Sequence, residues 1–500
     1  MQNNAIYGAV AQTEITNPEA EVLDPLYAKI LILRRDDVAA VIIGMDTTAI
    51  GGCAISDGIL PDGGENLRPA LQKVLHERFQ ISPESLLLNA SHTHPAGRLL
   101  CNEATQIQRI AEAIGEALAR LEPVKIGVGA GVVDDLTMNR VIQLKDGSDW
   151  TLRHTNPSPW DDEVKTIRPV DPGLCVIRVD KTDGTALALL YNFGCHPLFG
   201  DVSGRITANF VKAASQVIEE TLGGNAMAIF LQGAGGDVMD RTFKTFTRPR
   251  EVDTMGTMLG IAVLRAWRKI KPQADIEFAV RTEVFALPRK SEAEYDRQIT
   301  LLQAEQSRLL TSLCGCTLNF KNFLTLFLQY RLNPEYPLGD VWDYLQDQSV
   351  GNTKRMEMDK LNRKLIEQYI GHIRTMEKLA KLQDDLATLL KHRKLRRESG
   401  EDTISHLLQV IRLGDSVLVA TGLEPLTAVA VKLRQSSPFA HTIIAGFSNQ
   451  YLHYGTPDDM YHGQGYEVRE NCLELGWEAI FLAKTKALLH EIRNTLLSSS

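Results

Sequence analysis

The stretch Leu86-Leu87-Leu88-Asn89-Ala90-Ser91-His92-Thr93-His94-Pro95 places an apolar run directly before two histidines. Such a run predicts a buried strand that ends where a loop begins. The same arrangement recurs where Ala186-Leu187-Ala188-Leu189-Leu190-Tyr191 leads through Asn192-Phe193-Gly194-Cys195 into His196-Pro197. A residue before proline is pushed toward extended geometry, so we expect the rings of His94 and His196 to point away from the strand ends. Imidazoles in this position are common metal ligands.

The bulk composition indicates a large globular chain. Its 500 residues are 44% hydrophobic and carry a formal net charge of -8. A surface for nucleic acid needs clustered lysines and arginines, so we expect no nucleic-acid partner. The chain shows no signal peptide pattern and no apolar run of about 18 residues, which predicts a cytoplasmic protein without a transmembrane segment. The seven scattered cysteines favour reduced thiols.

Alternating strand-like and helix-like segments predict an α/β fold over residues 1–287 that resumes over residues 403–500. Residues 288–402 are rich in charged, helix-favouring sequence and are predicted to be a long α-helical insertion. Within the insertion, apolar residues recur at helical spacing from Leu361 to Leu379, as expected of an amphipathic helix that packs on a partner. The insertion could cover the pocket or form a homo-oligomer contact, and the periodicity fits both.

Two further polar sites follow predicted strands in the second α/β segment. Glu424 comes shortly after the strand Ser416-Val417-Leu418-Val419-Ala420, and Tyr451 and Tyr454 follow the strand that starts at Thr442. Ligands gather outside the carboxyl ends of strands in α/β sheets, so these residues and the histidines could converge. Two imidazoles and a carboxylate are a common zinc set for hydrolysis. Taken singly, each residue could equally be a structural hydrogen-bonding or packing residue.

The ordered set of motifs resembles the neutral/alkaline non-lysosomal ceramidase family. The motifs are Ser91-His92-Thr93-His94, His196-Pro197, Gly236-Asp237-Val238, Gly422-Leu423-Glu424-Pro425, Asn449-Gln450-Tyr451-Leu452-His453-Tyr454 and Gln464-Gly465-Tyr466-Glu467. The resemblance spans both α/β segments. It implies a mixed-sheet, metallohydrolase-like catalytic domain that cleaves a small-molecule amide with zinc as its cofactor.

The resemblance also implies roles for individual residues. The zinc ligands would be His92, His196, Glu424 and a tyrosine, for which the spacing to Tyr466 favours Tyr454 over Tyr451. His94 would be a proton donor or oxyanion partner, and Arg140 would lie near the substrate. The implied substrate-binding residues are Tyr451, Tyr466, Gly236 and Asp237.

Two departures from the family pattern bear on function. Met239 stands where the family carries a serine after Gly-Asp-Val, which excludes a serine nucleophile at that position. The C-terminal sandwich domain typical of the family is expected to be missing. We therefore predict a ceramidase-like zinc amidohydrolase that uses activated water and is not itself a ceramidase. There are two alternatives: another metal-dependent reaction on the same scaffold, and a non-catalytic binding scaffold.

Overall fold

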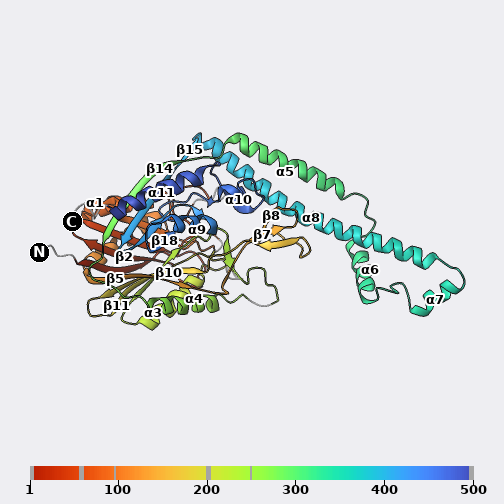
Figure 1. Ribbon diagram of the computed structural model, residues 1–500, viewed down its shortest axis with the longest axis horizontal. Coiled ribbons are helices and arrows are strands. Elements are labelled where there is room, and N and C mark those ends of the chain that lie inside the picture. Colours follow the sequence, from red (N-terminus) through yellow and green to blue (C-terminus); the bar gives the residue numbers. More distant parts are fainter. Residues whose placement is uncertain (1–4, 56–60, 95–96, 199–203, 248–249, 495–500) are drawn as a thin grey trace. The chain divides into compact units, whose positions relative to one another are not determined.

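The structure is a computed structural model that describes residues 5–55, 61–94, 97–198, 204–247 and 250–494. The chain divides into two compact units. The main unit comprises residues 1–152, 159–291 and 395–500, and the helical unit comprises residues 153–158 and 292–394. Each unit is described by itself (Figure 1).

A large mixed sheet forms the centre of the main unit. Its strand order is β12-β11-β10-β5-β1-β2-β3-β4, with parallel pairing of β3 with β4 and of β11 with β12 and antiparallel pairing elsewhere. The strands are β1 (Ile6–Glu14), β2 (Tyr27–Arg35), β3 (Val38–Met45), β4 (Leu86–Ala90), β5 (Glu122–Val132), β10 (Gly173–Lys181), β11 (Ala186–Phe193) and β12 (Met227–Gln232). The mixed-sheet α/β class predicted from the sequence is therefore confirmed.

A second sheet packs against one face of the large sheet. Its order is β14-β15-β16-β18, and its strands are β14 (Phe278–Pro288), β15 (Thr403–Leu413), β16 (Ser416–Ala420) and β18 (His441–Ala445). Side chains alternate across each strand, so Leu31 and Leu33 of β2 meet Ile411 and Leu418 of the second sheet in one apolar cluster. The two sheets therefore form the inner layers of the main unit.

Helices cover the outer faces of both sheets (Figure 1). Helices α1 (Leu67–Phe79) and α2 (Glu103–Leu118) pack on β1 to β4, while α3 (Phe210–Leu222) and α4 (Val252–Trp267) pack on β10 to β12. Helices α9 (Thr427–Ser436) and α11 (Trp477–Asn494) cover the second sheet. The result is an α/β/β/α arrangement in which β4, β11, β16 and β18 are buried and end near one another.

Short elements beyond these strand ends complete the main unit. They are β6 (Thr137–Asn139), β7 (Val141–Leu144), β8 (Asp149–Thr151), β9 (Val164–Ile167), β13 (Val238–Asp240), β17 (Glu424–Pro425), β19 (Tyr454–Gly455), α10 (Tyr466–Glu470) and the 3-10 turns η1 (Pro83–Ser85) and η2 (Asp458–Met460). Strand β17 pairs in parallel with β19, so Glu424 lies opposite Tyr454.

The helical unit contains α5 (Glu292–Ser312), α6 (Phe320–Leu332), α7 (Val341–Ser349) and most of α8 (Lys354–Ser399). The predicted amphipathic helix is part of α8, and its partners are α5 and α6. Leu382, Leu386 and Leu389 pack on α5, whereas Ile366 packs on α6. Two members of the predicted stripe, Leu361 and Met376, are exposed instead of packed. The sequence pattern therefore predicted more packing along α8 than the structure shows.

Other expectations concern the whole chain. All seven cysteines are free thiols, as predicted. Among the described residues, no helix is both long and apolar enough to cross a membrane.

Candidate metal centre

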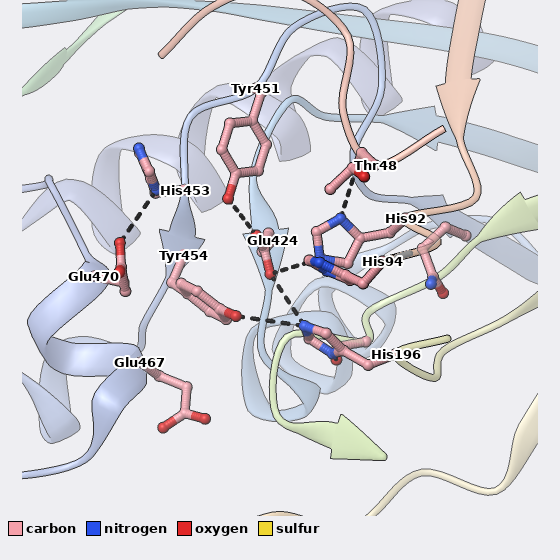
Figure 2. Close-up of polar contacts among 12 residues, drawn as sticks. Thr48, His92, His94, His196, Glu424, Tyr451, His453, Tyr454, Glu467 and Glu470 are labelled. Atoms are coloured by element: carbon pink, nitrogen blue, oxygen red, sulfur yellow. Dashed lines mark hydrogen bonds and ion pairs between the residues drawn. The ribbon is translucent and has the colours of Figure 1, made fainter. Parts of the chain in front are cut away.

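Three residues that are distant in the sequence meet beyond the strand ends of the main unit (Figure 2). His92 follows β4, His196 follows β11, and Glu424 lies in β17. The Oε2 atom of Glu424 lies 3.6 Å from Nε2 of His92 and 3.5 Å from Nε2 of His196. All three side chains are buried. The convergence that the strand pattern suggested is therefore present in the structure.

Backbone carbonyls fix the orientation of both imidazole rings. The Nδ1 atom of His92 lies 2.7 Å from the carbonyl oxygen of Thr48, and Nδ1 of His196 lies 2.5 Å from that of Gly235. A carbonyl oxygen only accepts, so each Nδ1 donates and each Nε2 keeps its lone pair for the site. Burial lowers the pKa of His92 to about 4, which keeps this ring neutral at pH 7. The Nε2 lone pairs of both rings thus face the site, where they can bind a metal.

The backbone at His92 adopts an uncommon conformation. Its φ is 66°, in the left-handed region that residues with a Cβ rarely occupy. Conformations of this kind cost energy and are concentrated at functional sites. The residue with this backbone conformation is the one whose ring faces Glu424.

Glu424 is a buried carboxylate with one oxygen unpaired. Its Oε1 accepts a hydrogen bond of 2.6 Å from the hydroxyl of Tyr451, while Oε2 has no hydrogen-bond partner among the described residues. Burial alone would raise the pKa of Glu424, but His92, His196 and Tyr451 hold it below its usual range. A buried anionic oxygen without a donor is costly, so this position is suited to a cation.

The spacing of these atoms fits a tetrahedral metal ion. Nitrogen and oxygen ligands lie about 2.0 to 2.2 Å from zinc, which separates neighbouring ligand atoms by roughly 3.3 to 3.6 Å. The separations between Glu424 and the two rings, 3.6 and 3.5 Å, match that range. His92, His94 and His196 also form a group whose ligand atoms all lie within 4.8 Å of one another. The residues present therefore fit a bound metal.

His94 lies beside His92, and its expected role as a proton donor or oxyanion partner stays a prediction. Its Nε2 is 2.9 Å from Nε2 of His92, and the residue is exposed. Because the proton of His92 is on Nδ1, His94 donates in this contact. The following residue, Pro95, lies outside the described residues.

Tyr454 and Tyr451 occupy different sides of Glu424 (Figure 2). The hydroxyl oxygen of Tyr454 lies 3.4 Å from Nε2 of His196 and accepts a hydrogen bond of 2.7 Å from Arg140. Tyr451 instead donates to the carboxylate that faces the histidines. Tyr454 is thus placed beside the histidine nitrogens and Tyr451 behind Glu424.

Arg140 is held by a buried ion pair that the sequence analysis missed. Its Nε donates to Oε1 of Glu467 over 2.7 Å, and its guanidinium lies over the rings of Tyr454 and Tyr466 at 5.5 and 5.7 Å from their centroids. Burial alone would lower the pKa of Arg140, but Tyr454 and Glu467 hold it above its usual value. The only feature of the sequence that could have indicated a role for Glu467 is its position directly after Tyr466. The pair fixes a cation and two tyrosines beside the site.

Comparison with known proteins gives a match in structure alone. No protein-family model and no curated protein matches the sequence. The neutral ceramidase from Pseudomonas aeruginosa superimposes with a TM-score of 0.62 at 13% identity, over 98% of this chain and 75% of that chain. This chain has the neutral ceramidase fold. A ceramidase complexed with C2 gives a TM-score of 0.61 at 12% identity, over 98% of this chain and 76% of that chain. The resemblance inferred from the motifs is confirmed at the level of fold.

Within the ceramidase fold, Gly236 and Asp237 contact elements that carry the site. A Cβ at Gly236 would lie 2.9 Å from the carbonyl oxygen of Glu424, so only glycine lets this turn approach β17. The carboxylate of Asp237 accepts hydrogen bonds from Asn139 at 2.7 Å and from Thr427 at 2.8 Å. Both residues are in a position to support Glu424 and Arg140, and direct contact with substrate stays a prediction.

Met239, at the family's serine position, is fully buried in an apolar cluster with Ile142, Trp150 and Phe243. Its thioether offers neither a nucleophile nor a useful hydrogen-bond donor. Any nucleophile for this site must therefore come from elsewhere.

Proposed function

We propose that this protein is a metal-dependent amidohydrolase that cleaves an N-acyl bond with activated water. The observation that carries the proposal is the buried Oε2 atom of Glu424. It accepts no hydrogen bond from any described residue and lies 3.6 Å from Nε2 of His92 and 3.5 Å from Nε2 of His196. His92, His196 and Glu424 would hold the metal, with Tyr454 beside them. Zinc bound there would polarise an amide carbonyl and make water acidic enough to lose a proton near pH 7.

The surrounding residues supply the remaining requirements of amide hydrolysis. Arg140 donates to the oxygen of Tyr454. The Tyr454 proton faces Nε2 of His196, and a metal bound to that nitrogen would leave the proton available to a substrate oxygen. Together Arg140 and Tyr454 offer positive charge and a donor where an oxyanion would develop. His94 donates from Nε2 and is exposed, so it is placed to donate a hydrogen bond to a substrate oxygen or to the leaving nitrogen. Glu467 keeps Arg140 in position without contacting the histidines.

The proposal is tested by assaying a panel of N-acyl amides, esters and lactones. The purified protein is assayed as isolated, after chelation, and after zinc is restored. We expect amide cleavage that chelation abolishes and zinc restores, and His196→Ala should lose both metal and activity. His76→Ala, which removes an exposed histidine on α1, is the matched control and should keep both. Amide cleavage that survives complete metal removal would contradict the proposal, as would a metal-loaded protein that cleaves none of the panel.

A further inference from the structure

One face of α6 in the helical unit carries an exposed apolar stripe. The α6 stripe consists of Phe320, Leu324, Leu328 and Leu332, which are 64%, 40%, 51% and 85% exposed. Residues four apart lie on the same face of a helix. The opposite face is already used, because Phe323 and Tyr330 are buried against Ile366 of α8. The stripe is therefore not needed to hold the helical unit together.

Two cations lie at the ends of this stripe. Lys321 precedes Leu328 by seven residues and Arg331 follows Leu324 by seven, so both lie near the stripe's own face. Both are exposed, and neither forms an ion pair with any described residue. Helix α6 contains no aspartate or glutamate. The exposed face of α6 is thus apolar along its middle and basic at both ends.

The next helix adds an aromatic residue to the same end of the unit. Figure 1 shows α6 and α7 close to the end of α8 where that helix begins. On α7, Trp342 and Leu345 are 64% and 59% exposed. Of the two acids on α7, Asp347 is paired with Arg355 at 2.9 Å, and Asp343 takes part in the capping box with Asp340 at the start of the helix. Tryptophan is enriched at membrane interfaces because its ring is apolar and its N–H is polar.

We propose that the α6 stripe, with Lys321 and Arg331, is a docking surface for a lipid bilayer that contains anionic lipid. A helix with one apolar face and basic residues beside it lies in the plane of the interface and buries that face among the lipid chains. The anionic headgroups would meet the two cations. No membrane-spanning segment is required.

The charges favour a bilayer over a second copy of this chain. In a symmetric dimer through α6, the stripe would face itself. Antiparallel helices would then bring Lys321 of one copy near Arg331 of the other, and α6 has no acid to offset them. Like charges brought together across an interface are unfavourable. This proposal is independent of the hydrolase activity, since it concerns binding alone.

Vesicle flotation of the full chain tests the proposal. Vesicles of phosphatidylcholine with phosphatidylserine are compared with phosphatidylcholine alone, using wild type, Leu328→Ser/Leu332→Ser and Lys321→Glu/Arg331→Glu. Burying one leucine side chain in the bilayer raises the water-to-bilayer partition coefficient by about tenfold, so the leucine variant should bind vesicles at least tenfold more weakly. The charge variant should lose the preference for phosphatidylserine. Leu310→Ser, an exposed leucine on α5, is the matched control and should bind like wild type.

Three results would overturn the proposal. They are wild type that fails to float with either vesicle, equal loss in the Leu310→Ser control, and full binding by the leucine variant. Light scattering supplies an independent reading: a wild-type dimer that dissociates in the leucine variant, without vesicle binding, would assign the stripe to self-association. Circular dichroism and thermal unfolding should be unchanged in every variant, because all the substituted side chains are exposed.

Discussion

Replacing Glu467 with glutamine should destabilise the chain by about 3 to 5 kcal/mol, the usual cost of removing one partner of a buried ion pair. Glu467 and Arg140 are 0% and 4% exposed and are joined at 2.7 Å, so the loss leaves a buried guanidinium without its counterion. Glutamine keeps the shape of the side chain. It can still accept from Thr151, which donates to Glu467 at 2.6 Å in the wild type. The effect therefore reports on charge and not on packing.

A double-mutant cycle with Arg140→Met measures the interaction free energy between Arg140 and Glu467. Urea unfolding is followed at pH 7 for the wild type, both single variants and the double variant, all stripped of metal. The double variant should be more stable than the sum of the single effects predicts, by about 2 to 3 kcal/mol, because it contains no unpaired buried charge. Strictly additive effects would refute the assignment of Glu467 as the counterion of Arg140. Metal content should be equal in all four proteins after reloading.

Three other consequences follow from single contacts. His406 is buried, and burial lowers its pKa to about 3. Below pH 6.5 the unfolded chain therefore binds a proton at His406 that the folded chain does not, and the free energy of unfolding should fall by about 2 kcal/mol from pH 6.5 to 5. His406→Gln should remove this part of the pH dependence of unfolding. Tyr451→Phe deletes the 2.6 Å hydrogen bond to Glu424 and should weaken metal binding about 10 to 100-fold in a chelator competition, whereas unchanged affinity would show that this bond does not orient the ligand. Gly236→Ala forces a Cβ to 2.9 Å from the carbonyl of Glu424 and should destabilise by about 1 to 3 kcal/mol in thermal unfolding, while Gly371→Ala, where nothing lies within 4 Å, should not; equal effects would contradict the close approach.

The sequence revealed which strands carry the site because each is a buried apolar run with a polar residue just beyond it. The predicted strands before His92 and His196 correspond to Leu86–Ala90 and Ala186–Phe193. Burial on both faces of a strand removes polar residues from it, so its end is visible as a change of composition. That signal requires no knowledge of tertiary contacts.

The supporting contacts could not be predicted in the same way. The rings of His92 and His196 are fixed by the carbonyls of Thr48 and Gly235, and a backbone carbonyl has no signature in the sequence. Arg140 and Glu467 are 327 residues apart, and nothing local indicates that either is buried. In the helical unit, periodicity showed an apolar stripe on α8 but not how far the neighbouring helices would cover it.

Anomalous diffraction from crystals of the zinc-loaded protein would show whether His92, His196 and Glu424 hold one metal ion. We expect a single strong peak in the main unit, about 2.0 to 2.2 Å from Nε2 of both histidines and from a carboxylate oxygen of Glu424. In crystals of Glu424→Gln grown and loaded in the same way, that peak should be greatly reduced. A peak elsewhere, or an undiminished peak in the variant, would contradict the account.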